Sequence, residues 1–203
     1  MATTVFLVRH GQTPSNVTGF HMGWSQEDLS EAGYEQARRL SARMAALPLA
    51  AVYASPLRRT LTTAAIIAGP HRLEPEVLDD LVEIRLGDWE GLYPDEISRR
   101  WPELWRQSRT NPSDVAMPNG ESFAQVTERA IRAFNTVTQA NVDRQVVLVT
   151  HLIVVRVLAA YALGVANSIY RKLEIANASL SIVRITDSQP KLVLLNDTSH
   201  LED

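Results

Sequence analysis

Cysteine is absent from this chain of 203 residues, which excludes disulfides, thiolate catalysis and cysteine-rich metal sites. Basic tracts are also absent, and 20 basic residues against 23 acidic ones give a net charge of -3. This balance gives no general reason to bind nucleic acid or an anionic membrane. Apolar runs are too short to span a bilayer, and the first residues lack the pattern of a signal peptide. We expect a cytoplasmic protein with neither nucleic acid nor membrane as partner.

Apolar residues are numerous enough for one sizeable core, since they make up 45% of the chain. Neither an internal repeat nor a low-complexity segment divides the sequence, and no linker is visible. We therefore expect a single domain over residues 1–203, present as a monomer or a homodimer.

A buried strand near the start of the chain ends at a basic pair. Residues 5–8 form an unbroken apolar run, which predicts a strand buried on both faces. Arg9 and His10 follow directly, and Gly11 allows a tight turn. Because open α/β sheets bind ligands at the carboxyl ends of their strands, this pair is expected at the mouth of a site. Taken alone, the pair could equally be an ordinary polar end to a strand.

Two more predicted strands end in residues that suit an anion. Residues 50–54 lead into a helix that begins near residue 56, with Arg58 and Arg59 in its first turn. Cations oppose the helix dipole there unless an anion lies between them, and we assign Arg58 to that anion and Arg59 to solvent. Residues 146–149 lead to His151 and an apolar helix, whose dipole favours a neutral imidazole that can still donate to phosphate. The alternative for His151 is a polar helix cap.

Glu83 is the candidate proton donor. It lies in a carboxylate-rich loop, residues 81–91, between apolar Val82 and Ile84. Apolar surroundings favour the neutral form of a carboxyl group, which suits general acid catalysis. The alternative is a surface acid in a charged loop.

The remaining segments predict an α/β fold with a covering insertion. Residues 13–30 read as a long polar loop, and residues 93–121 as helical and loop segments that cover the site. Further helices are expected at 30–47, 94–107 and 122–139, and further strands at 73–78, 178–185 and 192–196.

These residues together suit phosphoryl transfer through a histidine. His10 would attack phosphorus, while Arg9, Arg58 and His151 hold the phosphate oxygens. Glu83 would protonate the departing alcohol and then take a proton from the attacking water. No metal or other cofactor is required, because guanidinium and imidazole groups neutralise the phosphate. The expected partner is a small phosphorylated metabolite.

Residues 7–13, Leu-Val-Arg-His-Gly-Gln-Thr, resemble the signature of the histidine phosphatase superfamily, the phosphoglycerate mutase-like proteins. The resemblance extends over nearly the whole chain through motifs in the same order, at 29–37, 55–60, 83–91, 119–122 and 150–151. It implies a three-layer α/β/α sandwich with a mostly parallel central sheet, and a phosphohistidine intermediate. It also implies that Asn16 contacts the phosphate.

The resemblance includes one departure, because Leu152 stands where many members have glycine after the second histidine. Its backbone N–H can still bind phosphate, but its side chain should reshape the pocket. The metal-independent phosphoserine phosphatases of the family also lack this glycine, and segments 177–179 and 200–201 resemble theirs. The broad-specificity phosphatases of the family share a similar C-terminal end and resemble this chain at residues 22–24 as well, so both branches stay open.

Three functions remain possible at this point. The first is a phosphatase for small phosphomonoesters, with a leaving-group pocket drawn from His21, Met22, Gly23, Trp24, Met117 and His200. The second is a phosphoglycerate mutase, although residues 89–91 look like the phosphatase version of that loop. The third is a non-catalytic phospholigand-binding protein on this fold, against which the full set of candidate catalytic residues argues. The sequence does not set the physiological substrate.

Overall fold

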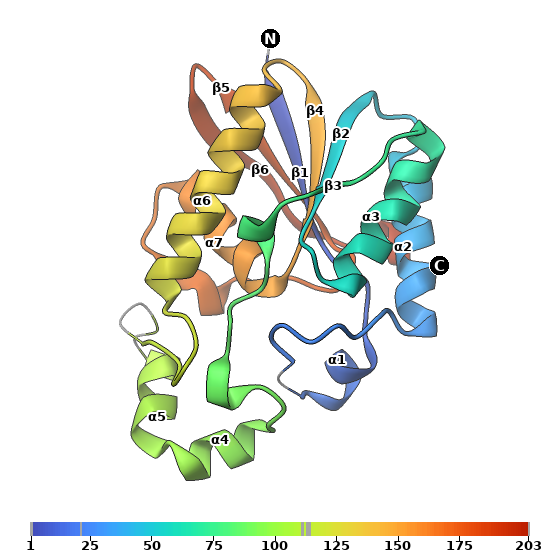
Figure 1. Cartoon of the computed structure of the whole chain (residues 1–203). Helices are drawn as coiled ribbons and strands as arrows, with labels where there is room; N and C mark the ends of the chain where they lie inside the picture. The colour runs from blue at the N-terminus through green and yellow to red at the C-terminus, as the bar shows by residue number, and fades with distance from the viewer. Residues whose placement is uncertain (1, 21, 111, 113–114, 203) are drawn as a thin grey trace.

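Six described strands form one sheet in the order β3-β2-β4-β1-β5-β6. The computed structural model describes residues 2–20, 22–110, 112 and 115–202 (Figure 1). The strands are β1 (Thr3–Arg9), β2 (Leu49–Ala54), β3 (Glu76–Val77), β4 (Gln145–Thr150), β5 (Leu180–Thr186) and β6 (Gln189–Asp197). The first four pair in parallel, whereas β5 runs antiparallel to β1 and β6 antiparallel to β5. The expected mostly parallel sheet is confirmed.

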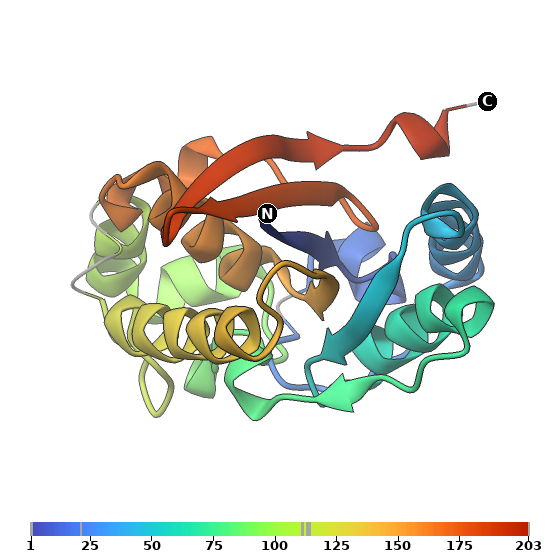
Figure 2. The ribbon, with the colours of Figure 1, turned by 90° about the horizontal axis from the view of Figure 1, so that it is seen from above.

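Helices cover both faces of this sheet. The described α-helices are α1 (Pro14–Thr18), α2 (Glu31–Met44), α3 (Arg58–Ala68), α4 (Pro94–Arg100), α5 (Pro102–Thr110), α6 (Phe123–Ala140) and α7 (Leu152–Leu163). Figure 2 shows α2 and α3 on one side of the sheet and α6 and α7 on the other. None of the described helices has the length and apolar character needed to cross a membrane.

The alternation of β1 explains the three layers. Val5 and Leu7 belong to the core beneath α6 and α7, whereas Phe6 and Val8 belong to the core beneath α2 and α3. Successive side chains of a strand point to opposite faces, so an unbroken apolar run fills both cores at once. The strand is thereby fixed between two helical layers, and its carboxyl end is held rigidly.

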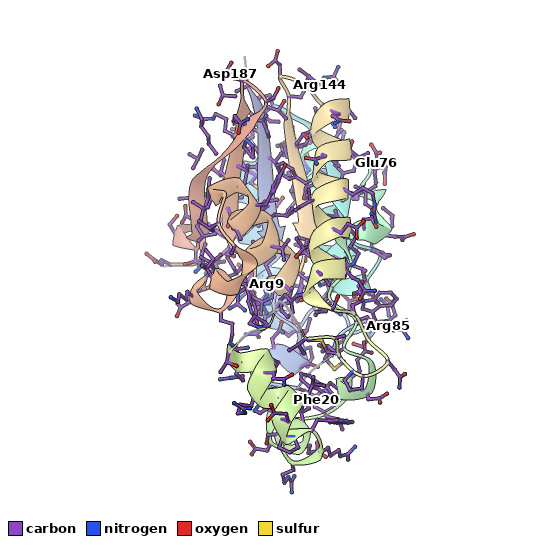
Figure 3. All side chains as sticks on the ribbon, turned by 90° about the vertical axis from the view of Figure 1, so that its left-hand side faces the viewer. Arg9, Phe20, Glu76, Arg85, Arg144 and Asp187 are labelled. Carbon is purple, nitrogen blue, oxygen red and sulfur yellow. The ribbon has the colours of Figure 1, made fainter. Side chains whose placement is uncertain are left out.

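The parallel strands point toward one end of the molecule, where α1, α4 and α5 lie (Figure 1). Figure 3 places Arg9 at this end, and Arg144 and Asp187 at the opposite end of the sheet. The insertion that carries α4 and α5 therefore lies beside the residues that leave β1.

Two expected elements are different in the structure. The strand predicted at 73–78 is reduced to the two residues of β3, because Pro75 has no N–H to donate to a ladder. The loop predicted at 13–30 contains α1, which begins at Pro14 after the N-cap residue Thr13. Proline at the first helical position is a recognised start signal, so this short helix was visible in the sequence.

Candidate active site

A cavity of about 420 Å³ opens where β1 ends. Its described walls come from the loop after β1, the first turns of α3 and α7, the loop around Glu83, and helices α4 and α5. Phe20 contributes to the same cavity and packs edge-on against Tyr93, with ring centroids 5.0 Å apart; Figure 3 shows it beside α4. The segment expected to cover the site thus supplies part of the wall.

His10 and His151 leave neighbouring parallel strands at the same level. Arg9 of β1 is paired with Thr150 of β4, so each histidine follows one residue beyond this pair. Their ring centroids lie 5.2 Å apart in an edge-on arrangement. His10 lines the cavity, whereas His151 is fully buried beside it and is not among the described lining residues.

The tautomer of His10 follows from the hydrogen bond that its ring makes with the Gly11 carbonyl. Nδ1 lies 2.7 Å from the Gly11 carbonyl oxygen, which can only accept, so Nδ1 carries the proton. Nε2 therefore carries a lone pair. Burial lowers the pKa of His10 well below its usual range, and the cationic Arg59 and Arg9 lower it further. The imidazole is neutral near pH 7 and available as a nucleophile.

His151 is oriented by Ser55 at the end of β2. Nε2 lies 2.7 Å from Ser55 Oγ, and no other acceptor for this hydroxyl hydrogen is found among the described residues. We therefore assign the hydroxyl as donor, which leaves the proton on Nδ1. Nδ1 is buried and has no hydrogen-bond partner in the described part of the chain. Burial and the neighbouring Arg59 lower the pKa of His151 well below its usual range.

Two arginines line the cavity beside His10. Arg9 donates to the Ile175 carbonyl at 2.7 Å, and Arg59 donates at 2.8 Å to the carbonyls of Ser25 and Gly23. Each guanidinium group has five N–H donors, so donors remain for a ligand. Burial lowers the pKa of Arg9 to about 10, which still leaves it charged near pH 7.

The prediction that Arg58 binds the anion is wrong, because the structure places Arg59 in the cavity. The side chain of Arg58 is 67% exposed, and its Nε pairs with Asp28 at 3.3 Å. Arg59 is only 4% exposed and lies on the same helical stripe as buried Thr63 and Ile67. Helical spacing counted back from these two residues would have identified Arg59 in the sequence.

Glu83 faces the cavity in the surroundings expected from the sequence. Its Oε1 accepts from the Ile84 N–H at 2.8 Å, and Oε2 from the Ile153 N–H at the start of α7 at 3.4 Å. Burial raises the pKa of Glu83 above its usual value, although Arg59, Arg9 and these N–H groups act in the opposite direction. The raised pKa favours the protonated form that a proton donor needs.

Arg129 of α6 holds the backbone that carries Glu83. This arginine is 8% exposed. It donates to the carbonyls of Val82 and Glu83, and it forms two hydrogen bonds of 2.9 Å with the Glu121 carboxylate. The Arg85 N–H donates to the same carboxylate at 2.8 Å. This largely buried ion pair was not predicted from the sequence, since neither partner lies near Glu83 in the chain.

Asn16 and Leu152, the other predicted phosphate contacts, both line the cavity. Asn16 Oδ1 accepts from the Thr13 N–H at 3.1 Å and from Asn177 at 2.8 Å, so its amide nitrogen is the group left to donate. Leu152 begins α7, where backbone N–H groups lack partners within the helix.

Only some of the residues predicted for the leaving-group pocket line the cavity. Met22, Gly23 and Met117 line the cavity, whereas His21 lies outside the described residues. Trp24 is not among the described lining residues, because its indole N–H donates outward to the Glu83 carbonyl at 2.7 Å and its side chain is 41% exposed.

His200 lies away from the cavity, in the short helix η6 (Ser199–Leu201). Its Nε2 donates to the Ala178 carbonyl at 3.1 Å, and its Nδ1 accepts from Arg43 at 3.2 Å. Both ring nitrogens are thus used in holding the C-terminal segment against α2.

A second group of cavity residues was missed entirely. Tyr170, Arg171 and Arg156 line one wall, and Arg109 and Trp105 of α5 line another. No sequence motif marks these positions, because they come from separate segments that meet only in the folded chain. Within the described residues, no group of three or more His, Cys, Asp or Glu side chains could hold a metal ion. The site instead combines a neutral imidazole, guanidinium groups and a carboxylic acid, which suits transfer of a phosphoryl group.

Comparisons with known proteins agree with this geometry. Residues 5–198 match the model of the histidine phosphatase superfamily (branch 1). The chain is 33% identical over 197 residues to "Phosphoserine phosphatase 1" of Hydrogenobacter thermophilus, across 97% of this chain and 93% of that one. The structure of Bacillus stearothermophilus YhfR superposes with a TM-score of 0.94 at 32% identity, over 98% of this chain and 100% of that chain.

A phosphoserine phosphatase from Entamoeba histolytica is also similar in structure. It superposes with a TM-score of 0.88 at 25% identity, over 98% of this chain and 100% of that chain, and was solved with 3-phosphoglyceric acid and, as a mutant, with phosphoserine. These findings confirm the expected fold class and the expected class of enzyme, a phosphomonoester hydrolase. Since the family model covers nearly the whole chain, this protein belongs to branch 1 of the histidine phosphatase superfamily.

Proposed function

We propose that the chain is a metal-independent phosphatase that hydrolyses small phosphomonoesters through a phosphohistidine on His10. The observation that carries this proposal is the tautomer of His10, whose Nδ1 donates to the Gly11 carbonyl at 2.7 Å and leaves Nε2 free inside the cavity. Burial lowers the pKa of this imidazole, and Arg59 and Arg9 beside it lower the pKa further, so the ring stays neutral. Phosphoserine and 3-phosphoglycerate, ligands of the Entamoeba relative, are candidate substrates.

In the first step His10 Nε2 attacks phosphorus and the ester P–O bond breaks. Glu83 gives its proton to the departing oxygen, so the product leaves as an alcohol. Arg9, Arg59, Asn16 and the Nδ1–H of His151 hold the three phosphoryl oxygens, where charge is spread during transfer.

In the second step a water molecule replaces the alcohol. The Glu83 carboxylate takes a proton from this water while the water oxygen attacks phosphorus. The N–P bond breaks with its electron pair returning to His10 Nε2, and inorganic phosphate leaves. Glu83 is protonated again, so both residues return to their starting states without a metal or a further cofactor.

Trapping of the intermediate tests this function. Brief incubation with a radiolabelled phosphomonoester, followed by quenching in alkali, is expected to leave label that is stable to base, labile to acid and located on the His10 peptide. His10→Ala should remove both the label and the turnover while the far-ultraviolet circular dichroism stays the same. Turnover near the wild-type rate in this variant would rule out His10 as the nucleophile.

The products formed from 3-phosphoglycerate separate the remaining alternatives. Release of free phosphate supports the phosphatase, whereas interconversion to 2-phosphoglycerate in the presence of the bisphosphate would identify a mutase that returns the phosphoryl group. A folded protein that releases phosphate from no small ester, p-nitrophenyl phosphate included, would instead be a phospholigand-binding protein.

A further inference from the structure

The cavity contains more positive charge than a phosphate group requires. Its described lining includes five arginines, Arg9, Arg59, Arg109, Arg156 and Arg171, and Glu83 is the one carboxylate in that part of the wall. A phosphate monoester carries a charge of about -1.5 to -2 near pH 7. Arg9 and Arg59 beside His10 match this charge, so the other three cations are unaccounted for by the phosphate.

Arg156 and Arg171 form a pair on the cavity wall around Tyr170. Their guanidinium carbons each lie 5.7 Å from the ring centroid of Tyr170, a residue that is 4% exposed. Arg156 Nε donates to the Leu173 carbonyl at 2.7 Å, and Arg171 donates to the Tyr170 hydroxyl at 3.0 Å. These contacts leave donors on both guanidinium groups for a ligand. We call Arg156, Tyr170 and Arg171 the basic wall.

The basic wall is held in place by packing that does not depend on a ligand. The Tyr170 ring lies 4.5 Å from the ring of Phe123, centroid to centroid, at the start of α6. No carboxylate of the described residues forms an ion pair with Arg156 or Arg171. Burial lowers the pKa of Arg156, and Glu83 and Glu174 act to raise it, but neither carboxylate forms an ion pair with it. An anion bound between the two guanidinium groups would use their remaining donors.

The position of Arg156 places this anion on the leaving-group side of the reaction. Arg156 lies one helical turn into α7, whose first turn donates to the Glu83 carboxylate through Ile153. It is also close enough to Arg9 to lower the pKa of that residue, and Arg171 in turn helps lower the pKa of Arg156 behind the larger effect of burial. Since Glu83 faces the departing oxygen, the basic wall faces the group attached to that oxygen.

We infer that the cavity selects phosphomonoesters whose leaving group carries a second anionic group, such as a carboxylate, bound by Arg156 and Arg171. This inference rests on the proposed phosphatase function. It has a corollary for ammonium groups, which can only donate hydrogen bonds. Glu83 is the one described carboxylate of the lining and is used in proton transfer, so no described carboxylate is left to pair with an ammonium beside the basic wall. Of the candidate substrates, the site therefore prefers an anionic phosphomonoester without an amino group.

Three natural esters and one synthetic ester test the inference on the intact enzyme. 3-Phosphoglycerate and phosphoserine differ only in a hydroxyl in place of an ammonium, and glycerol 3-phosphate lacks the carboxylate. We expect kcat/KM to be about tenfold higher for 3-phosphoglycerate than for either of the others. This advantage should shrink as salt is added, because the second anion is bound through partly exposed charges. p-Nitrophenyl phosphate serves as the reference ester without a second anion.

Substitutions in the basic wall test whether it causes the preference for 3-phosphoglycerate over glycerol 3-phosphate. Arg156→Met and Arg171→Met should each reduce the ratio of kcat/KM between 3-phosphoglycerate and glycerol 3-phosphate toward one. Arg184→Met provides the control, since this exposed arginine of β5 lies outside the cavity lining and should keep the wild-type ratio. If Arg156→Met does not fold, the exposed Arg171→Met still decides the question.

The failures of the two proposals can be told apart. An enzyme that hydrolyses p-nitrophenyl phosphate but shows no advantage of 3-phosphoglycerate over glycerol 3-phosphate would overturn the assignment of the basic wall and leave the phosphatase intact. A preference for phosphoserine over 3-phosphoglycerate would overturn the corollary for ammonium groups. An unchanged ratio in both variants would overturn it as well. Absence of phosphate release from all four esters would instead contradict the phosphatase function.

Discussion

Ser55 Oγ lies 2.7 Å from Nε2 of His151, across the boundary between β2 and β4. The contact joins His151 to Ser55, for which the sequence predicted no role beyond its place in the motif at 55–60. It fixes the ring orientation and keeps the proton on Nδ1, the nitrogen that has no partner in the described chain. Ser55 is thereby a positioning residue. It orients His151, whose Nδ1–H is proposed to donate a hydrogen bond to the phosphate, and does not contact the phosphate itself.

Ser55→Ala is expected to lower kcat for p-nitrophenyl phosphate by about tenfold, because His151 loses the bond that sets its tautomer. Ser55→Thr keeps a hydroxyl and should recover part of the activity if the buried site accommodates the extra methyl group. Measurement of kcat and of the inhibition constant of inorganic phosphate would test this. Equal activity of the alanine variant and the wild type would show that Ser55 does not position the ring.

Arg58 and Arg59 form a matched pair of neighbours in which only one side chain reaches the cavity. Arg59→Met should lower kcat/KM by about a hundredfold or more, because it removes a fixed donor to the phosphoryl oxygens. Arg58→Met should change kcat/KM less than about twofold, because the removed group is exposed and its ion pair with Asp28 is partly solvated. The reverse order of effects would restore the assignment made from the sequence.

The contrast between these two arginines shows what the sequence could predict. Buried apolar runs identified β1 and β4, and therefore Arg9, His10 and His151, because a strand buried on both faces must emerge at a defined point. The helix dipole argument could not choose between adjacent residues of one turn, since it concerns distance from the helix end and not the face. Only the 3.6-residue spacing carries that information.

Contacts between segments that are distant in the chain could not be predicted from the sequence. The basic wall joins α7 to the short helix η5 (Asn167–Lys172), and the loop of Glu83 depends on an arginine in α6. Neither relationship leaves a local pattern in composition or periodicity. The prediction for His200 was wrong for a related reason, because the sequence does not show whether a polar residue in the C-terminal segment contacts a ligand or other parts of the chain. Both ring nitrogens of His200 form hydrogen bonds within the protein, with Arg43 and the Ala178 carbonyl.

The pH dependence should follow from two shifted groups. His10 must be neutral to attack, and its pKa lies below the usual value, so activity is lost only as the pH falls well below neutrality. Glu83 must be protonated to donate, and its pKa is raised, so activity toward alkyl esters declines as the pH rises through that raised value. For glycerol 3-phosphate, kcat is therefore expected to show an alkaline limb that p-nitrophenyl phosphate, with its acidic leaving group, lacks.

Glu83→Gln is expected to remove this alkaline limb and to slow glycerol 3-phosphate on the order of a hundredfold, with a smaller effect on p-nitrophenyl phosphate. The comparison uses kcat, which reports ionisations in the bound complex and not those of the free ester. Equal slowing of the two esters would remove Glu83 from the role of proton donor.

Glu83 should also affect stability in a pH-dependent way. Its pKa is raised on folding, so its contribution to stability is fully present below the unfolded value and is lost as the pH rises through the folded value. Glu83→Gln removes the buried charge and is expected to raise Tm more at pH 8 than at pH 4. Thermal unfolding at both pH values measures the difference, and an equal change in Tm at both would contradict it.

Arg129 and Arg132 offer a final matched pair on α6. Arg129→Met removes the cationic partner of the largely buried Glu121 carboxylate and the donor to the Val82 carbonyl, so it should destabilise the fold by about 3 kcal/mol. Arg132 pairs with Asp80 on the surface, and Arg132→Met should change stability little. Urea unfolding of both variants measures the difference.

Activity separates a local role of Arg129 from a general one. Since Arg129 holds the backbone of the proton donor, its loss should slow glycerol 3-phosphate more than p-nitrophenyl phosphate at a temperature where the variant is folded. The ratio of the two rates should therefore move in the same direction as in Glu83→Gln. A variant that is less stable but slows both esters equally would show that the ion pair with Glu121 stabilises the domain without positioning Glu83.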